Sequence, residues 1–349
     1  MQRRLVDLWY RAPANASLLQ PLAWLYGGLM GLRRWAYAHG WLAVLQAGRP
    51  VVVVGNLTVG GTGKTPLVAW LAQRLTSSGL KVGIVSRGYG RRDGGSVRTV
   101  HSDSGWREVG DEPLLLHRLT GCATVVARDR VKGARALVAR GVDVVLADDG
   151  LQHLRLARDC EIVVIDGARG LGNGRLLPAG PLREPARCLR EDSLLVCNGE
   201  AEHPSLRRAQ SLPPGKCFQM SLAGEQAHRL DGQAMPQLLE SFRGRRVHAV
   251  AGIGNPERFF RGLRQRGIDV VEHPFDDHHA FVASDLAFGD GAPVLMTEKD
   301  AVKCHAMADA RLWYVPVVAR FAEAEARELL DRLIRSLGPL PNPITDSGS

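Results

Sequence analysis

The sequence lacks a continuous apolar run of the roughly 20 residues that a bilayer-spanning helix needs. Its apolar N-terminal stretch, Ser17–Leu32, is shorter than that and contains Gln20 and Pro21. No cleavable signal peptide is evident. The six cysteines form no CxxC pair and show no zinc-ligand spacing, so reduced, cytosolic thiols are the default expectation.

Acidic residues are also in short supply. The chain has 36 Asp and Glu against 45 Lys and Arg, which gives a net charge of +9. Such a balance favours an anionic partner, either nucleic acid, acidic lipid head groups or a phosphorylated substrate, although solubility alone is an equally good explanation. The sequence has no recognisable DNA- or RNA-binding motif, so we expect no nucleic-acid partner and disfavour a nucleic-acid-dependent ATPase.

Aromatic residues make up only 6% of the chain, and they are crowded near its start. The first 41 residues contain Trp9, Tyr10, Trp24, Tyr26, Trp35, Tyr37 and Trp41, alternating with Arg3, Arg4, Arg11, Arg33 and Arg34. Aromatic and arginine residues around a short apolar segment are typical of a helix that lies in a membrane interface. The alternative is a helix that packs these aromatics on the protein's own core, and composition favours neither.

One segment predicts a nucleotide site. The β-branched run Val51–Val54 indicates a buried parallel strand. It is followed by a glycine-rich loop and by a helical pattern that stops at Gly79. This order is that of a P-loop, in which backbone N–H groups hold phosphates, a lysine reaches the β and γ oxygens and a hydroxyl contacts Mg²⁺. The residues expected to bind the triphosphate are Val59, Gly60, Gly61, Thr62, Gly63, Lys64 and Thr65.

The loop departs from the usual P-loop pattern. The usual pattern has a glycine five residues before the Gly-Lys pair, and this chain has Thr58 there. The Gly60-Gly61 pair is similar to the deviant loops of dimeric ATPases, but those carry a lysine where this chain has Val59. A dimeric ATPase or GTPase switch is therefore an alternative with one feature against it. A glycine-rich turn that binds nothing is disfavoured, because strand, loop and helix agree.

Two acidic pairs are candidates for chemistry. Asp148-Asp149 ends an apolar strand, and the carboxyl edge of a parallel sheet beside a P-loop is where Mg²⁺ and its waters are held. Adjacent carboxylates repel each other unless a cation lies between them, which favours a metal site. The alternative is that the pair forms a turn or a helix N-cap. Asp111-Glu112 begins a predicted helix. Kinases use an aspartate to accept the proton of an attacking hydroxyl, while acids are also ordinary at helix N-termini.

Weaker signals lie elsewhere. The run Phe275–His279 suits metal binding, an oriented base or a plain surface loop. Arg87 and Arg91 flank a Gly-Tyr turn, and Arg183-Glu184 follows a proline-rich segment. These arginines either neutralise phosphate charge or lie solvated on the surface. Gly252-Ile253-Gly254 lacks the third glycine of a dinucleotide-binding fingerprint and is interpreted as a tight turn.

The order of elements predicts the fold class. Strands alternate with helices, which favours right-handed βαβ crossovers and a parallel sheet, and the length of 349 residues suggests two domains. We expect an α/β fold with a P-loop NTPase-type parallel sheet domain and a second, smaller α/β domain. The expected boundaries are an N-terminal, membrane-associating interfacial helix at 1–45, the P-loop kinase domain at 46–215, the smaller domain at 216–338 and a disordered tail at 339–349.

Taken together, the motifs resemble those of a known family. They are Gly55-Asn56-x-Thr58-x-Gly60-Gly61-Thr62-Gly63-Lys64-Thr65-Pro66, Ser86-Arg87-Gly88-Tyr89-Gly90, Gly110-Asp111-Glu112-Pro113, Asp148-Asp149-Gly150-Leu151-Gln152-His153, Leu177-Pro178-Ala179-Gly180-Pro181-Leu182-Arg183-Glu184, Phe275-x-Asp277-His278 and Thr297-Glu298-Lys299-Asp300. In this order they resemble the tetraacyldisaccharide 4′-kinases, the lipid A 4′-kinases of Gram-negative bacteria. The likeness spans roughly residues 15–335, and the unusual P-loop belongs to the family pattern.

The resemblance implies an ATP- and Mg²⁺-dependent kinase at the cytoplasmic face of the inner membrane. It implies transfer of the γ-phosphate of ATP to the 4′-hydroxyl of a tetraacylated disaccharide 1-phosphate, with this lipid in the cleft between the two domains and no obligate protein partner evident. Exposing each CH₂ of its acyl chains to water costs ~0.8 kcal/mol. The enzyme must therefore dock on the membrane surface, which makes a membrane role for the N-terminal segment the expected one.

The resemblance also implies roles for single residues. The aspartate of the family's Gly-Asp-Glu motif and the histidine of its Asp-His motif are the catalytic pair, and they correspond to Asp111 and His278. The remaining expected residues are Lys64, Arg183 and Glu184 in catalysis, Thr65, Glu112, Asp148 and Asp149 at the metal, and Arg87, Tyr89 and His153 on the substrate.

Overall fold

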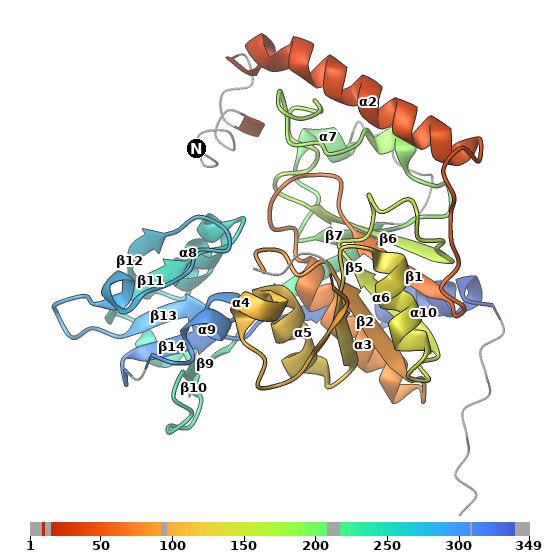
Figure 1. Ribbon diagram of the computed structural model, residues 1–349. Helices are drawn as coiled ribbons and strands as arrows, with labels where there is room; N and C mark the ends of the chain where they lie inside the picture. Colours follow the sequence, from red (N-terminus) through yellow and green to blue (C-terminus); the bar gives the residue numbers. More distant parts are fainter. Residues whose placement is uncertain (1–8, 11–14, 92–95, 208–216, 308, 339–349) are drawn as a thin grey trace, which may run out of the picture.

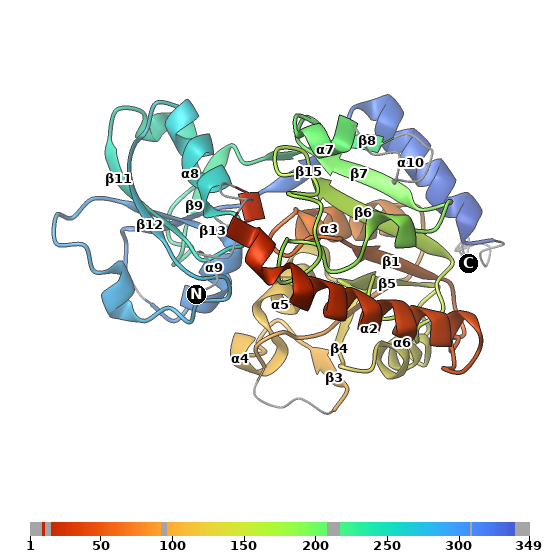
Figure 2. The same ribbon diagram turned by 90° about the horizontal axis from the view of Figure 1, so that it is seen from above.

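The chain forms two lobes that lie side by side, each built on its own sheet (Figures 1 and 2). The structure is a computed structural model that describes residues 9–10, 15–91, 96–207, 217–307 and 309–338. We call the described parts of 15–223 and 318–338 the large lobe, and those of 226–315 the small lobe. The tail expected at 339–349 lies outside the described residues.

The large lobe contains most of the elements. In chain order they are η1 (Asn15–Leu19), α2 (Gln20–Ala38), β1 (Val51–Gly55), α3 (Lys64–Ser77), β2 (Val82–Ser86), β3 (Arg98–Val100), α4 (Trp106–Val109), α5 (Asp111–Thr120), β4 (Ala123–Val126), α6 (Arg130–Val138), β5 (Val144–Asp148), β6 (Cys160–Asp166), η2 (Ala186–Cys188), β7 (Leu194–Asn198), α7 (Pro204–Arg207), β8 (Cys217–Ala223), β15 (Val318–Arg320) and α10 (Glu323–Ser336).

The described strands of the large lobe form one sheet in the order β15-β8-β7-β6-β1-β5-β2-β4-β3. Its strands are parallel except for the pairs at the two edges, β15 with β8 and β3 with β4. The α/β fold with a parallel-rich sheet is therefore confirmed. Strand β1 lies between β5 and β6, and Val54 pairs with Asp148. Because neighbouring parallel strands end at the same edge, the loop after β1 and the acids after β5 lie together.

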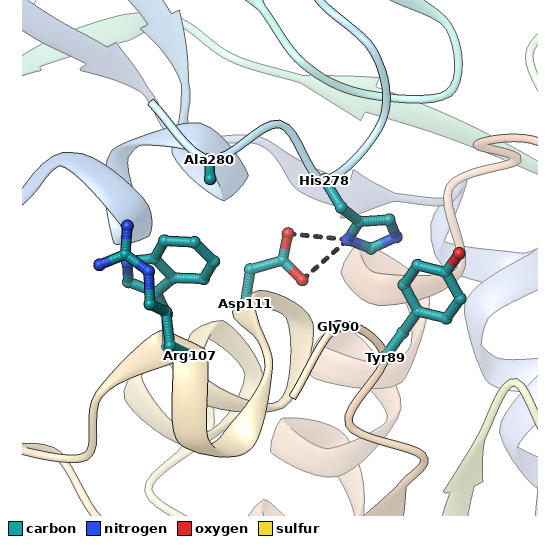
Figure 3. A pocket seen from close by; sticks show the side chains of 7 residues that line it. Tyr89, Gly90, Arg107, Asp111, His278 and Ala280 are labelled. Atoms are coloured by element: carbon teal, nitrogen blue, oxygen red, sulfur yellow. Dashed lines mark hydrogen bonds and ion pairs between the residues drawn. The ribbon is translucent and has the colours of Figure 1, made fainter. Parts of the chain in front are cut away.

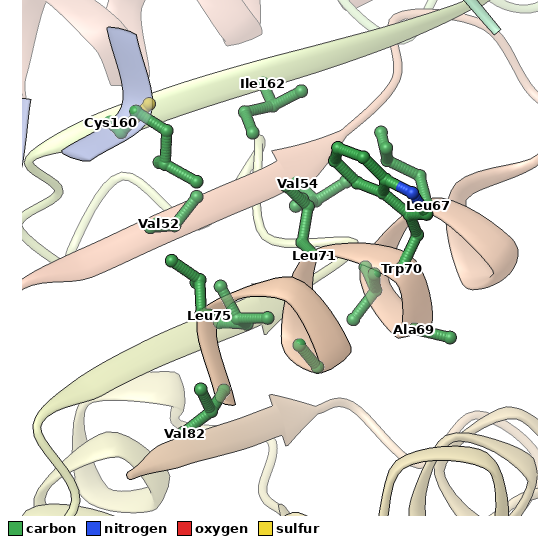
Figure 4. Packing of buried hydrophobic residues seen from close by; sticks show 14 of the residues in the cluster. Val52, Val54, Leu67, Ala69, Trp70, Leu71, Leu75, Val82, Cys160 and Ile162 are labelled. Carbon is green, nitrogen blue, oxygen red and sulfur yellow. The ribbon is translucent and has the colours of Figure 1, made fainter. Parts of the chain in front are cut away.

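Burial explains why β1 is apolar throughout. Successive side chains of a strand point to opposite faces, and helices cover both faces of this sheet. Val52 and Val54 pack with Leu67, Leu71 and other residues of α3 in one apolar cluster (Figure 4). Val51 and Val53 belong to a second cluster on the other face. Burying each such side chain contributes about 1.5–3 kcal/mol, so the central strand that carries the loop is held firmly.

The sheet divides the chain at other places than the expected boundary between 215 and 216. Strand β8 pairs with β7, and β15 pairs in turn with β8, so both belong to the large sheet. Helix α10 buries Leu329 and Leu333 in the same cluster as β1. The small lobe is thus inserted between β8 and β15. This arrangement depends on the pairing of β15 with β8, two strands that are far apart in sequence, so no local sequence pattern predicts it.

The small lobe has its own sheet and core. Its elements are β9 (Gln226–Arg229), β10 (Gln237–Leu238), η3 (Leu239–Phe242), β11 (Arg246–Ala251), α8 (Pro256–Gln265), β12 (Asp269–Pro274), η4 (Ala283–Leu286), β13 (Val294–Thr297), α9 (Glu298–Cys304) and β14 (Leu312–Val315). The sheet order is β10-β9-β14-β13-β11-β12, with parallel pairing from β14 to β12. Phe242, Phe260 and Leu295 are among the fully buried side chains of its core.

The N-terminal helix α2 runs across the outside of the large lobe (Figures 1 and 2). It covers Gln20–Ala38, a shorter span than the expected 1–45, and residues 1–8 and 11–14 lie outside the described part. One side of it is fastened to the lobe. Tyr26 donates a hydrogen bond to the Arg183 carbonyl at 2.8 Å, and Arg34 forms an ion pair with Glu184 at 2.8 Å.

The other side of α2 is apolar and faces solvent. Trp24 is 70% exposed and Leu25 is 64% exposed. The further exposed apolar residues of α2 are Leu22, Leu29, Leu32 and Trp35, and the chain next to the helix adds Leu18 before it and Trp41, Leu42 and Val44 after it. Within the described residues, no helix has the length and hydropathy needed to cross a membrane.

Candidate active site

The P-loop follows β1 and turns into α3. Gly60 and Gly63 have φ values of 112° and 95°, which L-residues with side chains rarely adopt. A Cβ on Gly63 would also collide with Asn198, whose amide donates to the Thr62 carbonyl at 2.8 Å. Among the described residues, no hydrogen-bond partner is found for the buried Thr62 hydroxyl. The loop is thus a preformed cradle with an unmet polar group, which fits a triphosphate.

Lys64 is the first residue of α3 and points back toward the end of β5. Its ammonium donates to the Asn56 side-chain oxygen at 2.9 Å and lies 3.4 Å from the Asp149 carboxylate. Asn56 in turn donates to the Thr58 carbonyl at 2.6 Å, within the loop itself. The loop therefore fixes the position of its own lysine, as a phosphate site requires.

The proline-rich segment before Arg183 is an antiparallel partner of the P-loop. The Val59 amide donates to the Pro181 carbonyl at 2.8 Å, and the Arg183 amide donates to the Leu57 carbonyl at 2.7 Å. These bonds bring the Arg183 guanidinium to within 3.0 Å of Asp149. Expected residues Lys64, Asp149 and Arg183 therefore meet. Glu184 is turned the other way, buried against Arg34 of α2.

Asp148 and Asp149 have opposite electrostatic surroundings. Burial, with the charges of Glu112 and Asp149, raises the pKa of Asp148 to about 7. Burial also acts to raise the pKa of Asp149, but the charges of Lys64 and Arg183 outweigh it and hold that pKa below its ordinary value. A carboxyl that resists ionisation beside other acids is a place where a cation is favoured.

The described residues contain no cluster of three or more His, Cys, Asp or Glu side chains arranged as a ready metal centre. A magnesium ion that comes with a nucleotide needs only one or two carboxylates, because phosphates and waters supply its other ligands. The pair of Asp148 and Asp149, with Thr65 at the start of α3, fits such a donor set. Glu112 acts on the pKa of Asp148 but lies in an ion pair with Lys299.

Asp111 and His278 meet across the two lobes (Figure 3). Asp111 begins α5, and His278 lies in the loop after β12 with a φ of 62°. The His278 Nδ1 atom lies 3.0 and 2.9 Å from the two Asp111 carboxylate oxygens. Two residues that are 167 positions apart in sequence are thus brought into contact by the approach of the lobes.

The charge state of this pair follows from its neighbours. Burial acts to raise the pKa of Asp111, but Lys299 and the hydrogen bond from His278 lower it overall. Burial acts to lower the pKa of His278, and the hydrogen bond to Asp111 reverses this and raises it. The carboxylate is therefore ionised at neutral pH, and the imidazole holds its Nδ1 proton toward it.

A hollow of about 240 Å³ opens beside the pair (Figure 3). It is lined by Tyr89, Gly90, Trp106, Arg107, Asp111, His278 and Ala280. The Tyr89 ring lies 4.8 Å from the His278 ring, between centroids. A second hollow of about 180 Å³ shares Tyr89 and is lined by Arg87 and two further arginines, Arg91 and Arg128. Of the residues expected at the substrate, Tyr89 therefore borders the Asp111–His278 pair, and Arg87 lines the adjoining hollow.

His153 follows the Asp148-Asp149 turn, and its amide donates to the Gly150 carbonyl at 2.9 Å. Burial, with the charge of Arg130, lowers the pKa of His153 to about 4, so its imidazole is neutral at physiological pH. Its Nε2 atom is buried and has no hydrogen-bond partner among the described residues. An unmet buried polar atom is consistent with a contact to a ligand or an ordered water.

The small lobe also touches the P-loop directly. Arg169 of the large lobe donates to the Gly254 carbonyl at 3.0 Å and to the Asn255 side chain at 2.9 Å. A Cβ on Gly254 would collide with the backbone nitrogen of Gly61. The Gly252–Gly254 turn, interpreted from sequence as a tight turn alone, is therefore the point where one lobe rests on the phosphate loop of the other.

Sequence reasoning gave no role to several residues that shape this site. Asn56 and Lys299 stood in recognised motifs, so the motifs themselves were the signal. Lys303 follows Lys299 by one helical turn, a spacing that places both on one face of α9. Asn198 and Gly254 had no local signal, because their contacts with the P-loop come from distant parts of the chain.

The chain is similar to known proteins over most of its length. The family model described as tetraacyldisaccharide-1-P 4′-kinase matches residues 15–335. A tetraacyldisaccharide 4′-kinase from Alkalilimnicola ehrlichii is 51% identical over 336 residues, covering 96% of this chain and 98% of that protein. The protein of the same name from Xanthomonas euvesicatoria pv. vesicatoria is 49% identical, with 93% and 94% covered. The crystal structure of an "apo" form of LpxK from Aquifex aeolicus in complex with ATP has a TM-score of 0.72 and 29% identity, covering 92% of this chain and 99% of that one.

Proposed function

Because the chain belongs to the tetraacyldisaccharide 4′-kinase family and is an ATP-dependent kinase of lipid A biosynthesis, we propose that it transfers phosphate at the inter-lobe site of Asp111 and His278. The observation that supports this most strongly is the contact between these two residues. It places a base candidate from one lobe and its partner from the other beside a hollow. The family assignment replaces the alternatives of a dimeric ATPase and a nucleic-acid-dependent ATPase.

The P-loop residues Val59–Thr65 hold the triphosphate of ATP in this proposal. Lys64 and Arg183 stabilise the charge that develops on the transferred phosphoryl group, and each such donor contributes about 10²–10³ in rate. Asp148 and Asp149, with Thr65 and with Glu112 nearby, hold Mg²⁺. The ion supplies charge neutralisation at the phosphates when it is bound.

Asp111 accepts the proton of the attacking 4′-hydroxyl. Its ionised carboxylate is a weak base, which suffices because phosphoryl transfer is loose and the proton leaves late. His278 orients the carboxylate through its Nδ1–H, and Asp111 alone takes up the proton of the hydroxyl. Tyr89, Arg87 and His153 position the sugar and its phosphate. Glu184 acts indirectly, since it holds Arg34 and so keeps α2 beside the segment that carries Arg183.

The enzyme meets its lipid at the cytoplasmic face of the inner membrane, as a peripheral protein. The exposed apolar side of α2 supports this, because it lies on the helix whose other side contacts the Arg183 segment. Soluble proteins rarely expose large contiguous apolar patches, and such a patch is typical of a surface that binds a protein or a membrane. The disaccharide head group then lies in the cleft between the lobes while its acyl chains stay in the bilayer.

The direct test measures ATP turnover by the purified chain with and without a detergent-dispersed tetraacyldisaccharide 1-phosphate. We expect turnover that depends on the acceptor and a product that gains one phosphate at the 4′ position, identified by mass spectrometry and NMR. A disaccharide blocked at the 4′-hydroxyl is the matched control. Equal turnover with the blocked and unblocked acceptors would contradict the proposal.

A further inference from the structure

Helix α9 of the small lobe packs directly against α5 of the large lobe. Its Val302 is buried in an apolar cluster with Val109, Leu114 and Val126 of the large lobe. One turn earlier, Lys299 points toward the first turn of α5, where Asp111 and Glu112 lie. The interface between α5 and α9 therefore has a charged part at Lys299 and Glu112, next to Asp111, and an apolar part at Val302.

Lys299 bridges the two lobes. Its ammonium lies 2.8 Å from the Glu112 carboxylate of α5 and 3.1 Å from the Asp277 carboxylate of the loop after β12. The lysine side chain is only 15% exposed, so solvent screens these two ion pairs weakly. Removing one partner from such a group leaves charges without compensation, which makes the bridge costly to break.

The bridge runs beside the catalytic contact. Glu112 follows Asp111 in the chain, and Asp277 precedes His278. The pair Asp111–His278 and the bridge Glu112–Lys299–Asp277 therefore connect the same two segments, the start of α5 and the loop after β12, at adjacent residues. Because adjacent residues of one backbone move together, the bridge restrains the position of the pair.

We propose that Lys299 is a positioning residue of the kinase: its bridge between Glu112 and Asp277 sets the approach of the lobes at which Asp111 and His278 meet. The inference rests on the proposed function of that pair. Lys299 positions the pair through its two carboxylate partners, and its charge also lowers the pKa of Asp111. A misplacement of about 1 Å between reacting groups costs on the order of 10² in rate, so the expected effect is large.

Lys303 is the second lysine of α9 near this interface, and its shortest contact is of a different kind. Its ammonium lies 2.7 Å from Asp300 of the same helix, and Asp300 also accepts from the Thr297 hydroxyl at 2.6 Å and the Gly252 amide at 2.9 Å. That network holds the small lobe together internally, whereas both partners of Lys299 lie outside α9. Lys303 also lies 3.9 Å from Asp111 of the large lobe, so its charge reaches across the lobes too, at a longer distance than the 2.8 Å between Lys299 and Glu112.

The kinetic test compares Lys299→Met with the parent enzyme. We expect kcat to fall by roughly 10² while KM for ATP changes less than about threefold. Lys299→Arg, which keeps the charge and can contact two carboxylates, should recover at least about a tenth of the parent kcat. Val302→Ala is the structural control: it loosens the same interface without touching a charge, and should lower Tm with kcat within about twofold of the parent.

Dependence on the catalytic pair is tested in a second background. In a His278→Ala enzyme there is no pair left to align, so adding Lys299→Met should lower kcat by less than about threefold. A full loss in both backgrounds, or a parent-like kcat in Lys299→Met alone, would overturn the proposal. If Lys299→Met does not fold, Asp277→Asn removes one arm of the bridge without removing a buried cation. It should lower kcat while KM for ATP stays the same.

Hydrogen exchange gives a readout that needs no acceptor. The His278 amide donates to the Gly252 carbonyl at 3.3 Å and the Phe275 amide donates to the Ala251 carbonyl at 2.8 Å. In Lys299→Met both should exchange faster while the amides of β1 and β11 stay unchanged. If the parent enzyme shows no acceptor-dependent turnover, the proposed function fails but this measurement still tests the bridge. Unchanged exchange in the loop would show that Lys299 does not hold the lobes.

Discussion

At the scale of single residues, the most direct prediction concerns Lys64. Its ammonium is held by Asn56 and Asp149 before any ligand binds, so it is preorganised for phosphate. Lys64→Ala should lower phosphoryl transfer by on the order of 10³ with little effect on folding. Lys81→Ala, at an exposed position outside the site, is the control. Near-parent turnover by a folded Lys64→Ala protein would contradict the role.

The Asp111–His278 contact predicts coupled effects on rate. Asp111→Ala should lower kcat by roughly 10²–10⁴ with little change in ATP affinity, because the proposal places Asp111 at the acceptor hydroxyl and away from the nucleotide. If His278 acts through Asp111, the double variant should be little worse than Asp111→Ala alone. Fully additive losses in a double-mutant cycle would show that His278 works separately, for instance on a phosphate oxygen.

Asp148 predicts a dependence of stability on pH. Burial and neighbouring acids raise its pKa to about 7, above the ordinary value of 3.8, so the folded protein resists its ionisation. Its contribution to stability is complete below pH 4 or so and is lost as the pH rises through 7. Asp148→Asn keeps an acceptor for the Ser86 hydroxyl and removes the charge. In Mg²⁺-free buffer it should raise Tm at pH 8, with a smaller gain at pH 5, while activity falls. A gain that grows as the pH falls would contradict this.

At the scale of elements, helix α2 has one side attached to the large lobe through Tyr26 and Arg34 and an opposite, exposed apolar side that we propose contacts the membrane. Leu22→Ser/Leu25→Ser/Leu29→Ser removes exposed apolar surface and keeps Tyr26 and Arg34 in contact with the lobe. We expect weaker co-sedimentation with anionic phospholipid vesicles and a higher KM for dispersed lipid acceptor, at unchanged Tm. The control is Met235→Ser/Leu238→Ser, which removes exposed apolar residues from the small lobe. Equal vesicle binding by the two variants would show that this side of α2 does not dock on the membrane.

Elements differed in how far sequence could predict them. Strand β1, the P-loop and α3 were predicted, because a buried β-branched run and a glycine-rich turn act over a few residues. Helix α2 was predicted as a helix, but its attachment through Tyr26 and Arg34 was not, since those partners lie more than a hundred residues away. The assignment of β8 and α10 to the large lobe likewise depends on pairing and packing with distant strands.

At the scale of the whole molecule, the proposed Asp111–His278 site lies where the lobes meet, whereas the P-loop and the Asp148-Asp149 turn belong to the large lobe alone. Motif resemblance pointed to both Asp111 and His278, the proposed catalytic pair, and the strand order explains why the P-loop and the Asp148-Asp149 turn share an edge. What sequence did not show is the contact between the lobes at Gly254, on the P-loop. The Asp111–His278 pair and the Gly254 contact together define one closed arrangement of the two lobes.

The Gly254 contact predicts a variant in which each lobe folds normally but the small lobe no longer reaches the P-loop. A Cβ at this position would collide with the backbone at Gly60 and Gly61, and neither atom belongs to a flexible side chain that could move aside. Gly254→Ala should therefore push the small lobe away from the P-loop and lower kcat by on the order of 10², because His278 moves with it. Tm should change little, since both cores remain intact. Gly289→Ala is the matched control in the same lobe, as a Cβ there meets nothing within 4 Å. A Gly254→Ala enzyme that turns over as fast as Gly289→Ala would show that catalysis does not need the lobes this close.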